Sequence, residues 1–249
     1  VFSQLNEILC VSELDQMEFA ALGADSKVSG DTRYDQVRER LKNPKPIRSE
    51  IFSGTRNSEP ILVAGSTWIE DERVLVATAE KLKHQSDLKL RWIIVPHEPS
   101  EGHIASLSHL LREARLSFSL YSRAARWDED VLIVDQVGIL AELYLRGQIA
   151  FVGGSFKKPV HSVMEPLAAG SATIVGPLHT NNREAIEFQK VEIAPRTTAV
   201  ASVADAQEFA AVLTNLIPQS NAELKARIVT EIEKRSGGSL LVADWALNR

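Results

Sequence analysis

The chain has 249 residues, of which 44% are hydrophobic and 24% charged, as in an ordinary globular protein. Its formal net charge of −5 argues against a general nucleic-acid-binding protein, which normally presents a basic face. No apolar stretch approaches the roughly 20 residues needed to span a bilayer, and the single cysteine, Cys10, is expected in the core without an internal disulfide.

Short apolar runs alternate with helical patterns from the beginning of the chain. The first part predicts strands over 7–12 and 26–30 and helices over 13–23 and 34–43. The segment 44–60, which holds three prolines and one glycine, is predicted to be a linker between domains.

After the linker the alternation resumes and continues to the end. Strands are predicted over 60–66, 90–96, 130–135, 149–155 and 171–177, and helices over 70–85, 103–115, 137–147, 162–170, 182–190, 203–217 and 221–237. Strands that are apolar throughout, each followed by a helix, indicate an α/β fold with a Rossmann-like, doubly wound parallel sheet. Residues 61–249 are predicted to form this domain, and 1–43 only a fragment of another.

Ligands of such sheets bind outside the carboxyl ends of the strands. Glycines, hydroxyls and one imidazole follow the predicted strands: Gly65, Ser66, Thr67, Pro96, His97, Val137, Gly138, Gly153, Gly154, Ser155 and Asn181. This set suits a phosphorylated ligand that is held by backbone N–H groups and small donors.

The stretch FVGGSFKKPVHSVMEPLAAG at 151–170 combines these features. Ser162 and Glu165 have the spacing of a capping box that starts a helix, and Gly170 is its expected end. A free helix N-terminus beside a glycine-rich turn can hold a phosphate. The alternative is an ordinary strand–turn–helix unit whose glycines only shape the turn.

Several common sites have no support in the sequence. There is no G-x-G-x-x-G or G-x-x-x-x-G-K-[ST] motif. His97 and His103 lack a convincing metal-ligand spacing, so no metal is predicted. Ser66 lacks the G-x-S-x-G setting of a hydrolase nucleophile.

One ordered set of motifs resembles a known family. It comprises V-S-G-D-T-R-Y-D at 28–35, A-G-S-T at 64–67, V-P at 95–96, V-G at 137–138, F-V-G-G-S at 151–155, H-S-V-M-E-P at 161–166 and G-P-x-x-x-N at 176–181. The set is similar to that of the 3-deoxy-D-manno-octulosonic acid (Kdo) transferases. These two-domain GT-B glycosyltransferases add Kdo from CMP-Kdo to a lipid A precursor. The resemblance implies that 1–43 is a remnant of the N-terminal acceptor domain and 61–249 the C-terminal donor domain.

The resemblance also implies roles for individual residues. Arg33 matches the family's transition-state lysine, and the contacts to CMP fall on Pro96, His97, Val137, Gly138, Ile139, Ser162, Val163, Met164 and Glu165. Glu165 would hold the ribose hydroxyls, with the CMP phosphate at the positive end of the helix that starts there. The sugar and phosphate neighbourhood falls on Gly65, Ser66, Thr67, Gly153, Gly154, Ser155 and Asn181.

Some motif positions depart from the family. His97 stands where the family has arginine, which loses a permanent charge and a planar fork. Ile139 replaces a glutamate and Ser162 an asparagine, while Pro159 and Val160 replace two glycines. The departures leave two interpretations open: a divergent member with an altered donor, or a protein that has lost the reaction.

The family's catalytic base is a glutamate near the start of the acceptor domain. Because the chain begins at Val1 in mid-pattern, this base and any membrane anchor are expected upstream. No cofactor is expected besides the donor. The full-length protein is expected at the cytoplasmic face of the bacterial inner membrane, with this fragment soluble. The alternatives are another GT-B enzyme, such as a UDP-N-acetylglucosamine 2-epimerase, and a non-catalytic nucleotide-binding domain.

Overall fold

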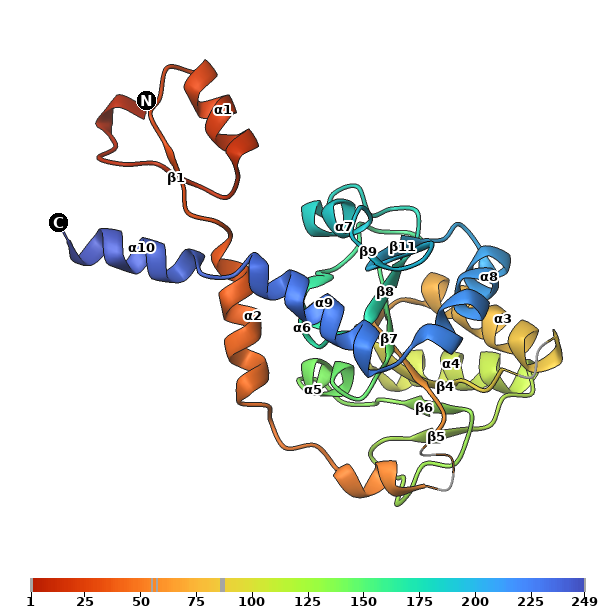
Figure 1. Ribbon diagram of the computed structural model, residues 1–249. Coiled ribbons are helices and arrows are strands. Elements are labelled where there is room, and N and C mark those ends of the chain that lie inside the picture. Colours follow the sequence, from red (N-terminus) through yellow and green to blue (C-terminus); the bar gives the residue numbers. More distant parts are fainter. Residues whose placement is uncertain (1, 55, 57, 86–87, 249) are drawn as a thin grey trace. The chain divides into compact units, whose positions relative to one another are not determined.

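The computed structural model describes residues 2–54, 56, 58–85 and 88–248. They form two compact units (Figure 1): the first combines Val1–Asn43 with Val229–Arg249, and the second is Pro44–Ile228. The helix α9 (Ala222–Lys234) contributes residues to both units.

The first unit joins the two ends of the chain. It contains η1 (Phe2–Gln4), β1 (Leu9–Cys10), α1 (Glu13–Ala21), β2 (Lys27–Val28), α2 (Thr32–Lys42) and α10 (Gly238–Leu247). The strands β1 and β2 pair in parallel, and Cys10 is buried and free, as expected.

Hydrogen bonds explain why the C-terminal helix lies in the first unit. The carboxylate of Asp35 in α2 accepts bonds from the amides of Gly237 and Ser239 at 2.7 and 2.8 Å. Trp245 Nε1 donates to Glu7 at 3.0 Å. The prediction that 61–249 forms one domain therefore differs from the structure at 229–249.

The second unit is built on a seven-stranded sheet in which every pair of neighbours is parallel. In spatial order its strands are β11 (Val200–Ser202), β8 (Ala172–Val175), β7 (Ile149–Val152), β3 (Ile61–Thr67), β4 (Arg91–Pro96), β6 (Val131–Ile133) and β5 (Phe118–Leu120). The predicted doubly wound α/β fold is confirmed. The edge strands β5 and β11 were not predicted, because their sequences FSL and VAS lack the continuous apolar run that marks the equally short β6.

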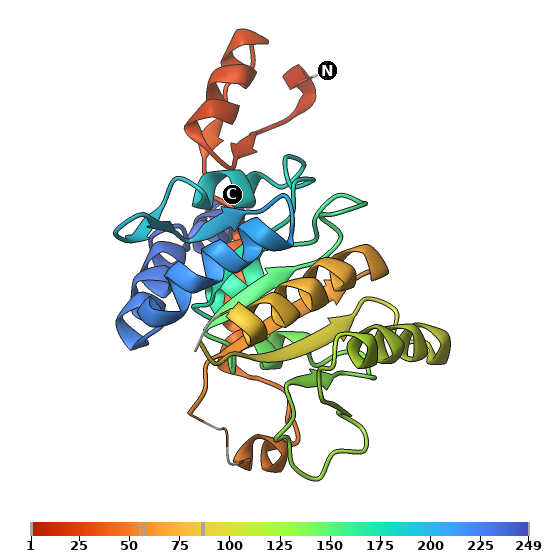
Figure 2. The same cartoon turned by 90° about the vertical axis from the view of Figure 1, so that its right-hand side faces the viewer.

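Helices cover both faces of this sheet. In Figures 1 and 2, α3 (Ile69–Gln85), α4 (Glu101–Glu113) and α8 (Ala206–Leu216) lie on one face, and α5 (Leu140–Tyr144) and α6 (Met164–Ala168) on the other. The helix α7 (Arg183–Phe188), the 3-10 turn η3 (Ile217–Gln219) and the hairpin of β9 (Glu192–Ala194) and β10 (Thr197–Thr198) complete the unit. The buried residues between the layers are mostly valine, leucine, isoleucine and alanine.

The strand order reverses beside β3. From β3 the chain moves outward through β4 to β6 and β5, then returns to β7 on the other side of β3 and continues to β8 and β11. The connections after β3 and β7 therefore lead to opposite faces of the sheet. A crevice at such a reversal is the usual ligand site of an open α/β sheet.

The predicted linker packs against the second unit. Ile51, in the 3-10 turn η2 (Ser49–Ser53), is fully buried, and its carbonyl accepts a bond from the amide of Trp127. Arg48 donates to the carbonyls of Tyr121 and Ala124 at 2.7 and 2.9 Å. Apolar burial and a bound guanidinium hold this segment in place despite its prolines.

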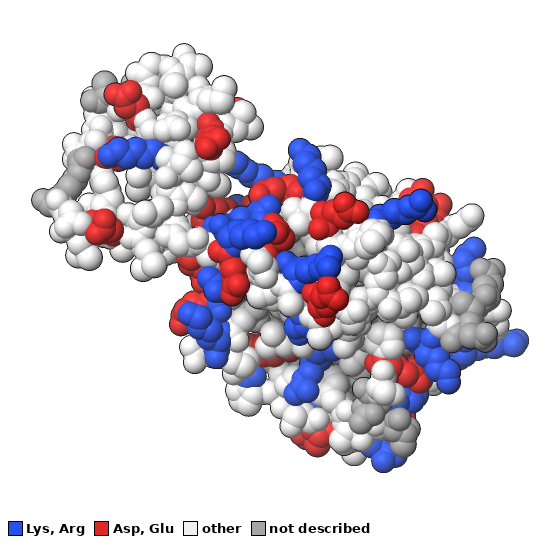
Figure 3. Space-filling model, in the orientation of Figure 1, with Lys and Arg blue, Asp and Glu red and all other residues white. Residues whose placement is uncertain are grey.

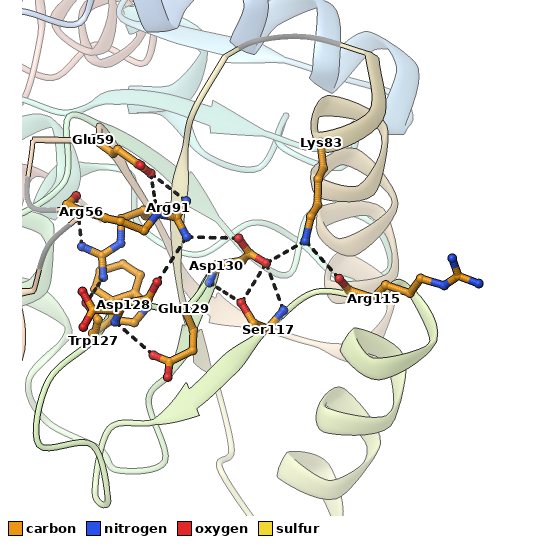
Figure 4. Close-up of polar contacts among 10 residues, drawn as sticks. All are labelled: Arg56, Glu59, Lys83, Arg91, Arg115, Ser117, Trp127, Asp128, Glu129 and Asp130. Atoms are coloured by element: carbon orange, nitrogen blue, oxygen red, sulfur yellow. Dashed lines mark hydrogen bonds and ion pairs between the residues drawn. The ribbon is translucent and has the colours of Figure 1, made fainter.

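The end of the segment joins a charged network at the amino ends of β4 and β6 (Figure 4). Arg56 forms ion pairs with Glu59 at 2.7 Å and with Asp130 at 3.1 Å, and Lys83 pairs with Asp130 at 3.0 Å. The guanidinium carbon of the buried Arg91 lies 3.4 Å from the ring centroid of Trp127. Burial lowers the pKa of Arg91 to about 10, so this side chain is still charged at neutral pH.

Candidate functional site

The carboxyl edge of the second unit's sheet brings most of the predicted residues together. Ser66 and Thr67 end β3, His97 follows β4, and Gly153 follows β7. Residues 137–139 follow β6, which is beside β4. Since all these strands are parallel, the segments that follow them lie at one edge.

The two glycines after β7 are required by close packing of the protein on itself. A Cβ atom at Gly153 would lie 2.3 Å from the carbonyl oxygen of Ser66. Gly154 has a φ of +90°, and a Cβ there would lie 2.7 Å from the carbonyl oxygen of Pro159 and 3.3 Å from the ring of His161. Of the two interpretations of these glycines, the structure supports the one in which they shape the turn.

The amides of this turn are already bound within the protein. Gly153 N donates to the carbonyl of Gly65 at 2.9 Å, and Gly154 N donates to Asp71 Oδ2 at 2.8 Å. Phe156 N donates to the other carboxylate oxygen of Asp71 at 3.3 Å. These three N–H groups therefore are not available to a ligand phosphate, contrary to the expectation from the sequence.

Asp71 was not among the predicted residues, although it organises this edge. It lies in the first turn of α3, is 1% exposed, and also accepts from Trp68 N at 2.9 Å. Burial raises the pKa of Asp71, and the three amide hydrogen bonds offset part of that effect. Its role is to connect the end of β3, the start of α3 and the turn after β7.

The next residue, Glu72, forms a second buried acidic contact. It accepts from Thr67 Oγ1 at 2.8 Å, and His103 Nε2 lies 3.0 Å from its carboxylate. The other ring nitrogen of His103 lies 3.0 Å from the carbonyl of Glu98, so the ring donates at both nitrogens when it is protonated. Burial raises the pKa of Glu72. Thr67 and Glu72 thus bond to each other inside the unit.

A column of aromatic rings stands at the same edge. The rings of Trp68 and His97 have centroids 4.9 Å apart, and those of His97 and His161 are stacked at 4.6 Å. Lys158 Nζ lies 3.5 Å from the centroid of Trp68. The amide of His97 donates to the carbonyl of Thr67 at 2.9 Å, which places its ring beside Trp68. Of these four residues only His97 was predicted. The sequence signal that could have found Trp68 and Lys158 is their position after predicted strands, where ligand-binding residues gather.

The predicted nucleotide contacts at 137–139 lie near α5. Val137 is 74% exposed and Ile139 is buried. Gly138 has a φ of +89°, and its carbonyl accepts from Lys45 Nζ at 3.2 Å. The amide of Lys45 donates to the buried Glu142 at 3.1 Å. An exposed apolar side chain beside a polar backbone thus forms this part of the edge.

The predicted contacts at 162–165 begin a shorter helix than expected. The N-cap is Val163, and α6 has only five residues. Ser162 Oγ accepts a hydrogen bond from the amide of Met164 at 3.3 Å. The predicted capping box had Ser162 as the N-cap, whereas the helix begins one residue later. Val163 and Met164 are buried, while Glu165 is partly exposed. Burial raises the pKa of the Tyr144 hydroxyl, and the charge of Glu165 raises it further. Because α6 is so short, its dipole provides little field for a phosphate.

The remaining predicted residues are divided between the interior and the rim. The Ser155 hydroxyl is buried, donates to the carbonyl of Val152 and accepts from the amide of Gly176 at 2.7 Å. Asn181 is exposed and donates to the carbonyl of Val160 at 3.4 Å. Gly65 and Pro96 are buried within β3 and β4.

Arg33 belongs to the first unit. Its Nε donates to both carboxylate oxygens of Asp31 at 3.0 Å, and its NH2 group pairs with Asp31 Oδ2 at 2.5 Å. The carboxylate of Asp31, the N-cap of α2, therefore fixes the guanidinium beside its own helix. The catalytic role of Arg33 remains a prediction.

The described residues offer neither a metal site nor a membrane-spanning helix. Among the described residues, no group of three or more histidine, cysteine, aspartate and glutamate side chains could hold a metal ion. Within the same part of the chain, no helix combines the length and apolar character that crossing a membrane requires. On the face in Figure 3, acidic and basic residues are intermixed.

Comparison with known sequences identifies relatives of this chain, although no protein-family model matches it. A 3-deoxy-D-manno-octulosonic acid transferase of Chlamydophila psittaci is 30% identical over 182 residues, which cover 71% of this chain and 40% of that protein. The chain thus spans less than half the length of this relative.

Solved structures show the same fold. The C-terminal CMP-Kdo binding domain of WaaA from Acinetobacter baumannii matches with a TM-score of 0.60 and 22% identity, over 81% of this chain and 98% of that domain. The UDP-GlcNAc 2-epimerase from Neisseria meningitidis matches with a TM-score of 0.63 and 13% identity, over 97% of this chain and 60% of the epimerase.

The structural matches establish the fold, whereas the sequence match separates one family from others that share it. The family resemblance of the motifs is confirmed by the transferase match. The chain is a distant homologue of the 3-deoxy-D-manno-octulosonic acid transferase family.

Proposed function

We propose that the chain is the donor-binding part of a glycosyltransferase that moves Kdo from CMP-Kdo to a lipid A precursor in lipopolysaccharide biosynthesis. The observation that carries this proposal is the 30% identity over 182 residues to a Kdo transferase. The fold of the second unit, which it shares with a CMP-Kdo binding domain, supports the proposal.

In this proposal the cytidylate lies at the carboxyl edge of the sheet. The carboxylate of Glu165 accepts hydrogen bonds from the ribose hydroxyls, and residues 96–97 and 137–139 contact the nucleotide. Glu165 suits this role because it is partly exposed on α6, which contacts α5, the helix that directly follows residues 137–139. The buried hydroxyls of Thr67 and Ser155 shape the edge from inside.

The transfer needs a base outside this chain. A carboxylate in the part of the relatives' length that this chain does not span would take the proton of the acceptor hydroxyl. The acceptor oxygen then forms a bond to the anomeric carbon of Kdo, while the bond from that carbon to the phosphate oxygen breaks and CMP leaves. Arg33 would stabilise the charge on the departing phosphate. The lipid acceptor places the full-length protein at the cytoplasmic face of the inner membrane.

Titration calorimetry with CMP and UDP tests the donor. CMP is expected to bind and UDP to bind more weakly. A preference for UDP would favour another nucleotide-sugar enzyme, such as a 2-epimerase. No binding of either nucleotide at millimolar concentration would contradict the proposal and favour a non-catalytic domain. Incubated alone with CMP-Kdo and acceptor, the chain is expected to show no turnover; measurable turnover would place the base within it.

A further inference from the structure

Four side chains from three connections form the aromatic and basic column at the sheet edge. Trp68 follows β3, His97 follows β4, and Lys158 and His161 lie in the connection after β7. The contacts run in order from Lys158 over the Trp68 ring, through His97, to His161. These are the connections that flank the reversal of strand order beside β3, so the column stands at the expected ligand crevice.

The column has positive charge that no acidic side chain neutralises. Among the described residues, neither Lys158 nor the two imidazoles form an ion pair with a carboxylate. The neighbouring acids are bound elsewhere. Glu70 pairs with Lys157, and Glu72 contacts His103.

The third neighbouring acid, Asp71, is also unavailable. Its carboxylate accepts bonds from the amides of Trp68, Gly154 and Phe156. Glu70, Asp71 and Glu72, the acids at the start of α3, therefore all have other partners. A basic group without a counter-ion at this edge, where the strand order reverses, can therefore attract an external anion.

The state of His161 agrees with this picture. Its pKa is lowered by burial, by His97 and by Lys158. The like charges thus disfavour protonation of the ring in the free protein. A bound anion would oppose this repulsion and favour the protonated imidazole, which then donates from both ring nitrogens.

We propose that Lys158, with His97 and His161, forms the subsite that binds the phosphate of the nucleotide donor. Trp68 positions Lys158, because its ring supports the ammonium group through a cation–π contact. These side chains provide the phosphate contacts that the amides of the turn after β7 cannot provide, because those amides donate to Asp71. This inference rests on the proposed function for the identity of the nucleotide, but not for the binding of phosphate.

Two matched variants test the proposal by calorimetry. Lys158→Met removes the ammonium group and keeps an apolar side chain that can cover Trp68. Lys157→Met is the control, because it makes the same change of charge at the adjacent exposed position, which pairs with Glu70. CMP and cytidine, which differ by the phosphate, are titrated into each protein. Thermal unfolding of both variants establishes that they are folded.

We expect Lys158→Met to weaken CMP binding roughly tenfold, as for the loss of one charge-assisted contact of about 1.4 kcal/mol. Cytidine binding should stay within about twofold of the wild-type value, as should CMP binding to Lys157→Met. Lys158→Arg should restore most of the affinity for CMP. Equal CMP affinity in Lys158→Met and the wild type would overturn the proposal, as would an equal loss for CMP and cytidine.

A separate titration distinguishes failure of this inference from failure of the proposed function. If the wild type binds neither CMP nor cytidine, the proposed donor is wrong. In that case inorganic phosphate is titrated into the protein, and its binding is monitored by the NMR signals of the His161 ring. Signals that move in the wild type but not in Lys158→Met support the phosphate subsite, and signals that do not move in the wild type overturn it.

Discussion

The amide of Gly154 donates a 2.8 Å hydrogen bond to the carboxylate of Asp71, which joins the turn after β7 to the start of α3. Asp71 therefore supplies from within the protein the negative charge that a glycine-rich turn could otherwise draw from a ligand. The anion-binding groups of this edge are consequently side chains, above all Lys158, rather than these amides.

Replacement of Asp71 by alanine should strongly destabilise the protein. The buried amides of Gly154, Trp68 and Phe156 would lose their acceptor, so the free energy of unfolding should fall by roughly 2–4 kcal/mol, measured by urea denaturation. Glu70→Ala is the control, because it removes a more exposed ion pair and should cost no more than about 1 kcal/mol. Equal losses in the two variants would refute the role of Asp71.

Gly153→Ala should prevent the turn after β7 from packing against the end of β3. Its Cβ would lie 2.3 Å from the carbonyl oxygen of Ser66, and backbone cannot move away without disturbing β3. We expect a loss of at least about 3 kcal/mol or failure to fold, measured by thermal unfolding. The matched change Gly102→Ala, in α4 with nothing within 4 Å, should be neutral or stabilise by up to about 1 kcal/mol. A Gly153→Ala protein of wild-type stability would contradict the packing at this turn.

Asp130 should make stability depend on pH in the acidic range. Burial raises the pKa of Asp130, but the hydrogen bonds from Lys83 and Ser117 together lower it by a larger amount. The net pKa is therefore below the ordinary value. A folded-state pKa below the unfolded value of about 3.9 stabilises the protein above that pH, and the contribution disappears as pH falls through the folded-state pKa.

Comparison of Asp130→Asn with the wild type over a pH series measures this contribution. The variant should be less stable by about 1–3 kcal/mol at pH 7, and the difference should shrink below about pH 4. The exposed Glu101→Gln should differ from the wild type by no more than about 0.5 kcal/mol throughout. A difference for Asp130→Asn that does not change with pH would rule out this linkage.

The pKa of His161 should lie below the ordinary value of about 6.5 in the ligand-free protein. The unfolded chain then binds the proton more readily than the folded protein. The stability that this residue contributes is therefore present above the pKa of the unfolded imidazole and is lost as pH falls from that pKa through the lower folded-state pKa. NMR titration of the ring protons should show that Lys158→Met raises the pKa of His161, whereas Lys157→Met leaves it in place. The opposite order would place Lys158 away from the ring in solution.

Glu165→Gln should weaken CMP binding by about tenfold without unfolding the protein, because a neutral amide accepts weaker hydrogen bonds from ribose hydroxyls. Calorimetry gives the affinity, and thermal unfolding gives the stability. Glu80→Gln, on the exposed side of α3, should bind CMP like the wild type. Unchanged affinity in Glu165→Gln would remove this residue from the site.

The sequence determined the architecture of the second unit, because apolar strands alternate with helical patterns and only a parallel sheet covered on both faces buries them all. It also located the edge at which His97, Gly153 and Glu165 lie, since parallel strands end on the same side. The ordered motifs pointed to the correct family.

Tertiary structure decided what the groups at that edge are free to do. Thr67 and Gly154 are predicted ligand-binding residues, but their hydrogen bonds to Glu72 and Asp71 occupy them within the protein. Trp68 and Lys158 are 90 positions apart, so no local pattern could bring them together. The same holds for Asp35 and Gly237, whose bond places the C-terminal helix in the first unit. Contacts between distant segments depend on how the layers pack, and periodicity along the chain does not encode them.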